Sequence, residues 1–146
     1  MIVLSAAMAG FLAAAAATEM PAVVIEAADS PVKIGRATVL TVAADPSVLL
    51  YEATNHTADD LEQFTVTVFM FDAKGILKTE QTAPGRRLLE AKTTKYSTIV
   101  LDGGTVDPAG SIVIGVNQAQ QLKSGTWWRA DLRTAAEAAV LRKKKP

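Results

Sequence analysis

The sequence has 146 residues, enough for one ordinary domain, and its 15 Lys and Arg residues balance 15 Asp and Glu residues. It contains no cysteine and only one histidine, His56. These counts exclude a disulfide scaffold, a thiolate metal site and a cysteine nucleophile, and they argue against a nucleic-acid-binding protein, which carries a marked basic excess.

The chain opens with an apolar segment. Residues 1–17 contain no charged side chain, and the first one in the sequence is Glu19. The length and the Ala and Leu content are typical of the apolar region of a secretory signal peptide, and the alanines ending at Ala17 are small residues of the kind that a signal peptidase needs. We therefore expect an N-terminal hydrophobic helix that is a signal peptide, cleaved near Ala17 or Ala22.

An uncleaved membrane anchor is the second interpretation of residues 1–22. A helix over residues 2–17 would be about 25 Å long, slightly short of a hydrocarbon core of ~30 Å, and adjustments at its flanks accommodate such a span. A buried, alanine-rich helix is the third interpretation. The first two place the folded part outside the cytoplasm, either periplasmic, secreted or on the cell surface, with membrane association through residues 1–17.

Residues 23–130 have the pattern of strands separated by turns. Val, Ile and Thr are frequent, Pro and Gly recur between them, and no apolar stripe of helical period lasts long enough for a helix. Short strands without intervening helices favour an all-β, antiparallel sandwich of about seven or eight strands. A turn is expected at Pro84-Gly85. The strand candidates are Ala22–Glu26, Ala37–Val42, Val48–Thr54, Gln63–Ala73, Ile76–Glu80, Lys95–Leu101, Ser111–Asn117 and Thr126–Ala130.

The clearest strand candidate is Gln63–Ala73. Its even-numbered residues from Phe64 to Met70 are all apolar, whereas the odd-numbered residues on the other face change from threonine to phenylalanine. The second half is therefore apolar on both faces, which predicts a central position in the sheet. Turn residues at Asp72–Gly75 then lead into the partner strand of a hairpin.

The middle of the chain resembles a known family. The resemblance begins with Asn55 at a strand end and Leu61 as a spacer. It continues with the strand and turn of Phe64–Gly75 and with a Leu-rich run that ends near Tyr96. These features are similar to the FxLYD-type immunoglobulin-like domains, β-sandwich modules of secreted or surface-bound prokaryotic proteins. The resemblance covers residues 48–101, about a third of the chain, and departs from the family at Ala91. It implies an immunoglobulin-like sandwich with a non-enzymatic role and no catalytic residues.

Catalytic and metal-binding patterns are weak in this sequence. His56 lies in a polar loop beside two aspartates, but no second histidine or cysteine exists to complete a site, so a solvated loop histidine is the preferred interpretation. Acidic residues around Gly103-Gly104 lack the ligand count of a calcium loop. Neither a nucleophile elbow nor a phosphate-binding glycine loop occurs. We predict no enzyme activity, no cofactor and no metal; Asn55-His56-Thr57 is a formal N-glycosylation sequon.

Trp127-Trp128-Arg129 is the most informative local feature. On a strand, neighbouring side chains face opposite sides, so one indole would enter the core while the other faces outward. The outward indole would either cover the end of the sandwich or anchor a protein partner or a membrane interface.

The last residues have the pattern of a basic helix. Residues 129–146 carry six basic and two acidic side chains, whereas residues 18–128 carry nine basic and 13 acidic ones. We expect residues 131–146 to form a short helix or tail that frays or docks on a partner, because its apolar stripe is too small to insert deeply into a bilayer. The stripe consists of Leu132, Ala135, Ala136, Ala139 and Val140. The candidate partner-binding residues are Trp127, Trp128, Arg129, Arg142, Lys143, Lys144 and Lys145.

Together these features predict a non-enzymatic, extracytoplasmic β-sandwich module for protein interaction or structural support. Residues 1–22 would be the signal peptide or membrane anchor, residues 23–130 the sandwich domain, and residues 131–146 the basic helix. The alternative is a membrane-anchored accessory subunit of a larger membrane or surface assembly. In both cases the expected partner is a protein and not a nucleic acid.

Overall fold

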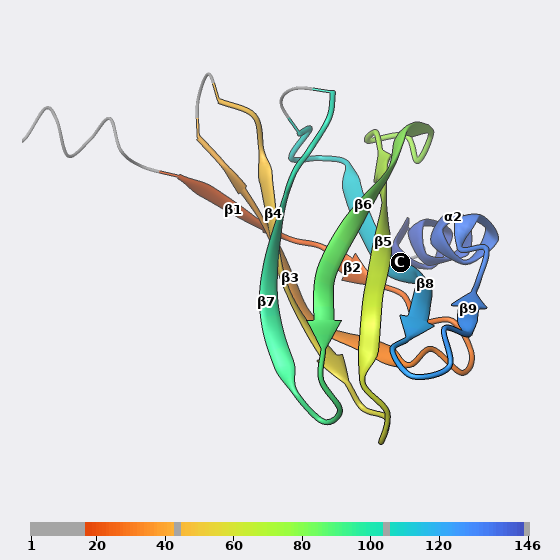
Figure 1. The fold of residues 1–146 in the computed structure, drawn as a ribbon. Helices are drawn as coiled ribbons and strands as arrows, with labels where there is room; N and C mark the ends of the chain where they lie inside the picture. Colours follow the sequence, from red (N-terminus) through yellow and green to blue (C-terminus); the bar gives the residue numbers. More distant parts are fainter. Residues whose placement is uncertain (1–16, 43–44, 104–105, 145–146) are drawn as a thin grey trace, which may run out of the picture.

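The computed structural model describes residues 17–42, 45–103 and 106–144. Within these ranges, nine strands form two facing sheets and one short helix lies near the C-terminus (Figure 1). The first sheet has the order β1-β3-β4-β7, with bounds Thr18–Pro21, Val32–Thr41, Val48–Asn55 and Thr94–Val100. The second has the order β2-β8-β5-β6, with bounds Val23–Val24, Ser111–Gln121, Leu61–Phe71 and Leu77–Leu89. Strand β9 (Trp127–Arg129) pairs with β8, and the helix is α2 (Arg133–Lys144).

The predicted two-sheet, mostly β architecture with a short C-terminal helix is confirmed. The predicted N-terminal hydrophobic helix lies outside the described residues. One part of the expectation is wrong: the pairing is not antiparallel throughout, because β2 pairs with β8 in parallel. The sandwich also begins at Thr18, since β1 pairs with β3, and not at Val23 as expected.

The N-terminal strands connect the two sheets. β1 belongs to the first sheet and β2 to the second, and only Ala22 separates them. Ala22 N donates to the carbonyl oxygen of Ala37 at 3.0 Å, and Ile25 N donates to that of Ile114 at 2.9 Å. The segment therefore crosses one open side of the sandwich and hydrogen-bonds to both of its layers.

The central strand β5 explains the main core. Its residues Phe64, Val66, Val68 and Met70 are buried between the sheets, together with apolar side chains of β3, β4, β7 and β8. Its residues Phe69 and Phe71 are buried in a second cluster on the opposite face. The predicted alternation and the central position of this strand are both confirmed, since β5 lies between β8 and β6.

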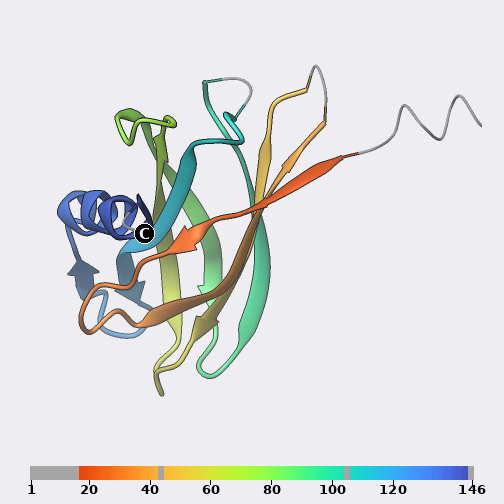
Figure 2. The ribbon, with the colours of Figure 1, turned by 180° about the vertical axis from the view of Figure 1, so that it is seen from behind.

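Helix α2 is what buries the second face of β5. It lies on the outer side of the β5–β8 sheet, away from the sheet of β3, β4 and β7, as Figure 2 shows from behind. Leu132, Ala136, Ala139 and Val140 pack there on side chains of β5 and β8. The helix was expected to fray or to dock on a partner, but it docks on the protein's own sheet. Ala135, a member of the predicted apolar stripe, is exposed.

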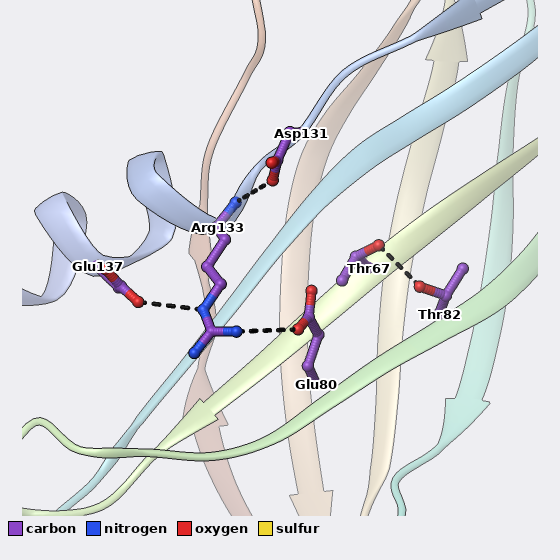
Figure 3. A network of polar contacts seen from close by, with 6 residues as sticks. All are labelled: Thr67, Glu80, Thr82, Asp131, Arg133 and Glu137. Atoms are coloured by element: carbon purple, nitrogen blue, oxygen red, sulfur yellow. Dashed lines mark hydrogen bonds and ion pairs between the residues drawn. The ribbon is translucent and has the colours of Figure 1, made fainter.

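Polar contacts fix the start of α2 over the neighbouring strands (Figure 3). Arg133 N donates to Asp131 Oδ1 at 3.1 Å, which caps the first turn. The Arg133 side chain contacts Glu137 Oε1 at 3.2 Å and Glu80 Oε2, on β6, at 4.0 Å. Beyond the helix, the outer face of this sheet is polar, with the bond of Thr65 to Asn117 as an example.

The segment Pro84-Gly85 is not the turn that was expected. It lies within β6, where the register against β5 shifts between Gln63 and Thr65. Proline is tolerated there because β6 is the edge strand of its sheet. On the open side of an edge strand there is no neighbouring strand, so the N–H that proline lacks has no partner to lose there. Glycine is required because a Cβ at Gly85 would lie 2.2 Å from Cε2 of the buried Phe64 ring.

Replacing Gly85 by alanine is therefore expected to destabilise the protein by about 2 kcal/mol, the usual cost of overpacking a core. Urea denaturation followed by tryptophan fluorescence measures it. Gly35→Ala is the matched control, because a Cβ there meets only the flexible end of Glu52. Equal stability of the two variants would contradict the tight approach of β6 to Phe64.

Candidate functional site

Three connections meet at one end of the sandwich and enclose a pocket. They join β2 to β3, β4 to β5 and β8 to β9. The pocket has a volume of about 360 Å³. We call it the loop-end pocket, and it is lined by Asp29, Pro31, His56, Thr57, Leu61, Ala119, Gln121, Thr126, Trp127 and Trp128.

The two tryptophans occupy different positions at this pocket. Trp128 pairs with the buried Ala119 and packs against the core between the sheets, so it forms an apolar wall with Leu61 and Pro31. Trp127 pairs with Gln120, and the guanidinium carbon of Arg129 lies 4.9 Å from the centre of its ring. Both indoles are partly buried and border the pocket. Arg129 is exposed and does not line the pocket.

His56 ties the pocket's connections together. Its ring Nε2 lies 2.6 Å from the carbonyl oxygen of Ser30, and its backbone N donates to the carbonyl oxygen of Pro31 at 3.3 Å. Lys92 Nζ donates to the His56 carbonyl oxygen at 2.6 Å. Because a carbonyl oxygen only accepts, Nε2 carries the hydrogen, and in the tautomer that this bond selects Nδ1 is an acceptor.

Asn55, immediately before His56, fixes the same end of the sandwich through buried hydrogen bonds. Its side chain is completely buried, and Nδ2 donates to the carbonyl oxygens of Asp59 at 2.8 Å and Leu89 at 3.0 Å. Oδ1 accepts from Thr57 N at 3.0 Å and from the Thr57 hydroxyl at 2.7 Å. The sequon asparagine is thus a structural residue whose amide is enclosed in the folded protein.

Further hydrogen bonds make the pocket a preformed site. Leu122 N donates to the carbonyl oxygen of Asp60 at 3.0 Å, which joins the β8–β9 connection to the β4–β5 connection. Ala91 N donates to Asp60 Oδ1 at 2.8 Å, which adds the β6–β7 connection. A site fixed in this way loses little conformational entropy when it binds a ligand.

The pocket carries polar atoms that internal bonds leave available. Gln121 Oε1 accepts from Ser124, but within the described residues no hydrogen bond occupies Gln121 Nε2, the Thr126 hydroxyl or the Asp29 carboxylate. His56 Nδ1 adds an acceptor. Asp29 is the single acidic side chain in the lining, which contains no lysine or arginine. The lining thus offers hydrogen-bond donors and acceptors beside Trp128, and Asp29 is its one acidic side chain.

The basic C-terminal residues are not part of this site. Arg142 and Lys143 are exposed at the end of α2, and neither lines the loop-end pocket. The side chain of Lys144 and the whole of Lys145 lie outside the described residues. Of the five candidate residues whose side chains the structure describes, Trp127 and Trp128 line the pocket, and Arg129, Arg142 and Lys143 do not.

The pocket and the start of β1 lie at opposite ends of the sandwich. Strand β3 begins at Val32, next to the pocket residue Pro31, and ends at Thr41, which pairs with Thr18 of β1. Ten strand residues span about 30 Å. The chain therefore enters the sandwich at the end away from the β2–β3, β4–β5 and β8–β9 connections (Figure 1).

Neither a metal centre nor a membrane span is found in the part of the chain that the structure describes. No three His, Cys, Asp or Glu side chains are grouped there to hold a metal ion. None of the described helices has the length and apolar character needed to cross a membrane. Comparisons with family models, with curated proteins and with solved structures found no match.

Sequence reasoning identified the tryptophans but not the rest of the pocket. Asp29 and Pro31 lie in the β2–β3 connection and Gln121 ends β8, about 90 residues further along the chain, so only the folding of the strands brings them together. The positive φ of Asp29, 62°, is a turn feature that its neighbours Ser30 and Pro31 signal. Nothing in that local signal indicates a tryptophan nearby.

Proposed function

We propose that the protein is a non-enzymatic, extracytoplasmic binding module with an immunoglobulin-like fold, which holds its partner in the loop-end pocket. The observation that carries the proposal is the convergence of three preformed connections around Trp128. A pocket of this volume, with an apolar wall and a few available polar atoms, has the usual character of a ligand site.

The strand order supports the immunoglobulin-like assignment. If β3, β4, β5 and β6 are strands A, B, C and C′, then β7, β8 and β9 are E, F and G. The sheets become A-B-E and C′-C-F-G, with β1 and β2 as N-terminal additions. The loop-end pocket then lies between the B–C and F–G connections, which belong to the binding end of immunoglobulin variable domains. This also supports the resemblance to FxLYD-type domains noted for residues 48–101.

The direction of β1 supports an extracytoplasmic role. A leader or anchor in residues 1–17 would join the sandwich at Thr18, at the end opposite the pocket. A retained anchor would therefore present the pocket away from the membrane. Mass spectrometry of the natural protein distinguishes the two states: a first residue at or near Thr18 indicates cleavage, and an intact Met1 indicates a retained anchor.

Binding to envelope material tests the proposed function. Purified protein, Trp128→Ala and Tyr96→Ala are incubated with the cell-envelope fraction of the source organism, and the retained protein is quantified. Wild type and Tyr96→Ala are expected to be retained, and Trp128→Ala at least tenfold less, because Trp128 forms the wall of the pocket. Tyr96 is the control, an aromatic residue 61% exposed on another strand.

Equal retention of all three proteins would contradict binding at the pocket. Because Trp128 also packs on the core, Gln121→Glu serves as a second variant that keeps the apolar packing. Its retention is expected to fall as well, since it replaces the Nε2 donor by an acceptor. Circular dichroism confirms that each variant is folded.

A second candidate function is the accessory subunit of a larger assembly. It is favoured by the outer face of the first sheet, which no described element covers and where Leu50, Tyr96 and Val100 are 38%, 61% and 61% exposed. Such exposed apolar side chains on one face fit a neighbouring protein. In the same experiment, loss of retention with Tyr96→Ala and not with Trp128→Ala would favour this function over the first.

A further inference from the structure

We infer that the ligand of the loop-end pocket is a neutral saccharide; the inference rests on the proposed function and specifies its partner. A pyranose ring has an apolar C–H face and a periphery of hydroxyl groups that both donate and accept. Trp128, with Pro31, offers the apolar wall for such a face, and the buried Leu61 lies behind it. The polar atoms around that wall decide the class of ligand.

The available polar atoms match hydroxyl groups. Gln121 Nε2 donates, His56 Nδ1 and the Asp29 carboxylate accept, and the Thr126 hydroxyl does either. These groups come from the β2–β3 and β4–β5 connections and from the end of β8 with the connection that follows it, so separate parts of the fold supply them. A ring with hydroxyls on several sides can satisfy them together, because each hydroxyl supplies both a hydrogen and lone pairs.

Other ligand classes fit this lining less well. A purely apolar side chain would desolvate the amide, the carboxylate and the hydroxyl without replacing their hydrogen bonds with water. An anionic ligand would meet Asp29 and no cation in the lining. A cationic ligand would meet one carboxylate on an exposed residue, where screening by solvent makes a single ion pair weak.

The arrangement of the three connections also favours a preformed saccharide site. Saccharides present many hydroxyls that are well hydrated in water, so net affinity depends on polar partners that are already in position. The bonds of His56 to Ser30 and Pro31, and of Leu122 to Asp60, hold the backbone of these connections and the His56 ring in place before any ligand binds. The pocket volume of about 360 Å³ lies within the range of small-ligand sites.

The test is a fluorescence titration of the full chain. The protein has two tryptophans, and both border the pocket, so its intrinsic emission reports directly on occupation. Cellohexaose, chitohexaose, maltohexaose and mannohexaose are the probes, with choline and a trilysine peptide as cationic comparisons. We expect a saturable change in emission with at least one hexasaccharide and none with the cations.

Variants define where the probe binds. Gln121→Glu and Asp29→Asn are expected to weaken binding of that hexasaccharide about tenfold each, the loss of one hydrogen bond to a bound ligand. Asp29→Asn keeps a residue that tolerates positive φ, and Gln121→Glu keeps the acceptor for Ser124, so both should fold. Tyr96→Ala, away from the pocket, should leave the dissociation constant unchanged.

Three results would overturn the inference: no hexasaccharide binds, the cations bind instead, or binding is unaffected by both Gln121→Glu and Asp29→Asn. If envelope retention still depends on Trp128 in those cases, the proposed function stands and the saccharide class is wrong. If that retention is also independent of Trp128, the binding role of the pocket is wrong as well. The two failures are therefore distinguishable.

Discussion

Replacing Asn55 by alanine is expected to lower the free energy of unfolding by about 3 kcal/mol and the melting temperature by about 10 °C. The side chain is completely buried and makes four hydrogen bonds, two through Nδ2 and two through Oδ1. Alanine would leave the carbonyl oxygen of Leu89 without this partner in a buried position, and an unsatisfied buried group costs more than an average hydrogen bond contributes. Thermal denaturation followed by circular dichroism measures the change.

Asn117→Ala is the matched control for this prediction. Asn117 is only partly buried, on the outer face of β8, and its Oδ1 accepts a single bond from Thr65 at 2.6 Å. Its loss should cost about 1 kcal/mol. A similar, small change in both variants would show that Asn55 is not the internal anchor of the loop end.

The second large effect concerns the contact between α2 and its sheet. Leu132→Ala is expected to cost about 3 kcal/mol, because Leu132 is 3% exposed and packs in the cluster with Phe69, Phe71 and Val113. Leu132 packs closely over Gly115, where a Cβ would lie 2.8 Å from Leu132 Cδ1, and this glycine has no side chain that could fill the cavity left behind. Urea denaturation of the full chain measures the loss.

Leu141→Ala gives the control within the same C-terminal segment. Leu141 is 64% exposed, so its truncation should change stability by no more than about 0.5 kcal/mol. Docking of α2 on the sheet predicts this difference between the two leucines. If both variants kept wild-type stability, the helix would not be packed as described.

Much of the fold could be predicted because local pattern and tertiary environment agree. The alternation from Phe64 to Phe71 identified the central strand and both of its buried faces. The turn after it was also predictable: Asp72 Oδ1 accepts from Lys74 N and Ile76 N, and Gly75 has a φ of 82°. Those backbone bonds, chiefly that of Ile76, lower the pKa of Asp72.

The errors have a common cause in contacts between distant segments. Pro84-Gly85 has the composition of a turn, yet β5 and the Phe64 ring hold it in an extended edge strand. Thr18–Pro21 follows an apolar segment and has little strand character by itself, but β3 supplies a partner for it. The stripe on α2 was recognised, whereas the surface that it covers depends on the sheet topology.

The candidate site was predictable only where composition is unusual. Two adjacent tryptophans are conspicuous in a chain that is 5% aromatic. The lone histidine was correctly placed in a loop, but its link to Ser30 joins residues 26 positions apart and has no local signal. The basic tail was equally conspicuous, but its described members Arg142 and Lys143 do not line the pocket.

The division of the N-terminal segment between two sheets has a mechanical consequence. If the protein is held at Thr18 and pulled at its far end, tension runs nearly parallel to the strands. Extraction of β1 then requires its four residue pairs with β3 to slide together, and β2 adds its parallel pairs with β8. Loading in shear distributes force over many hydrogen bonds at once, whereas peeling would break them one after another. A domain held at Thr18 in this way would resist unfolding under tension.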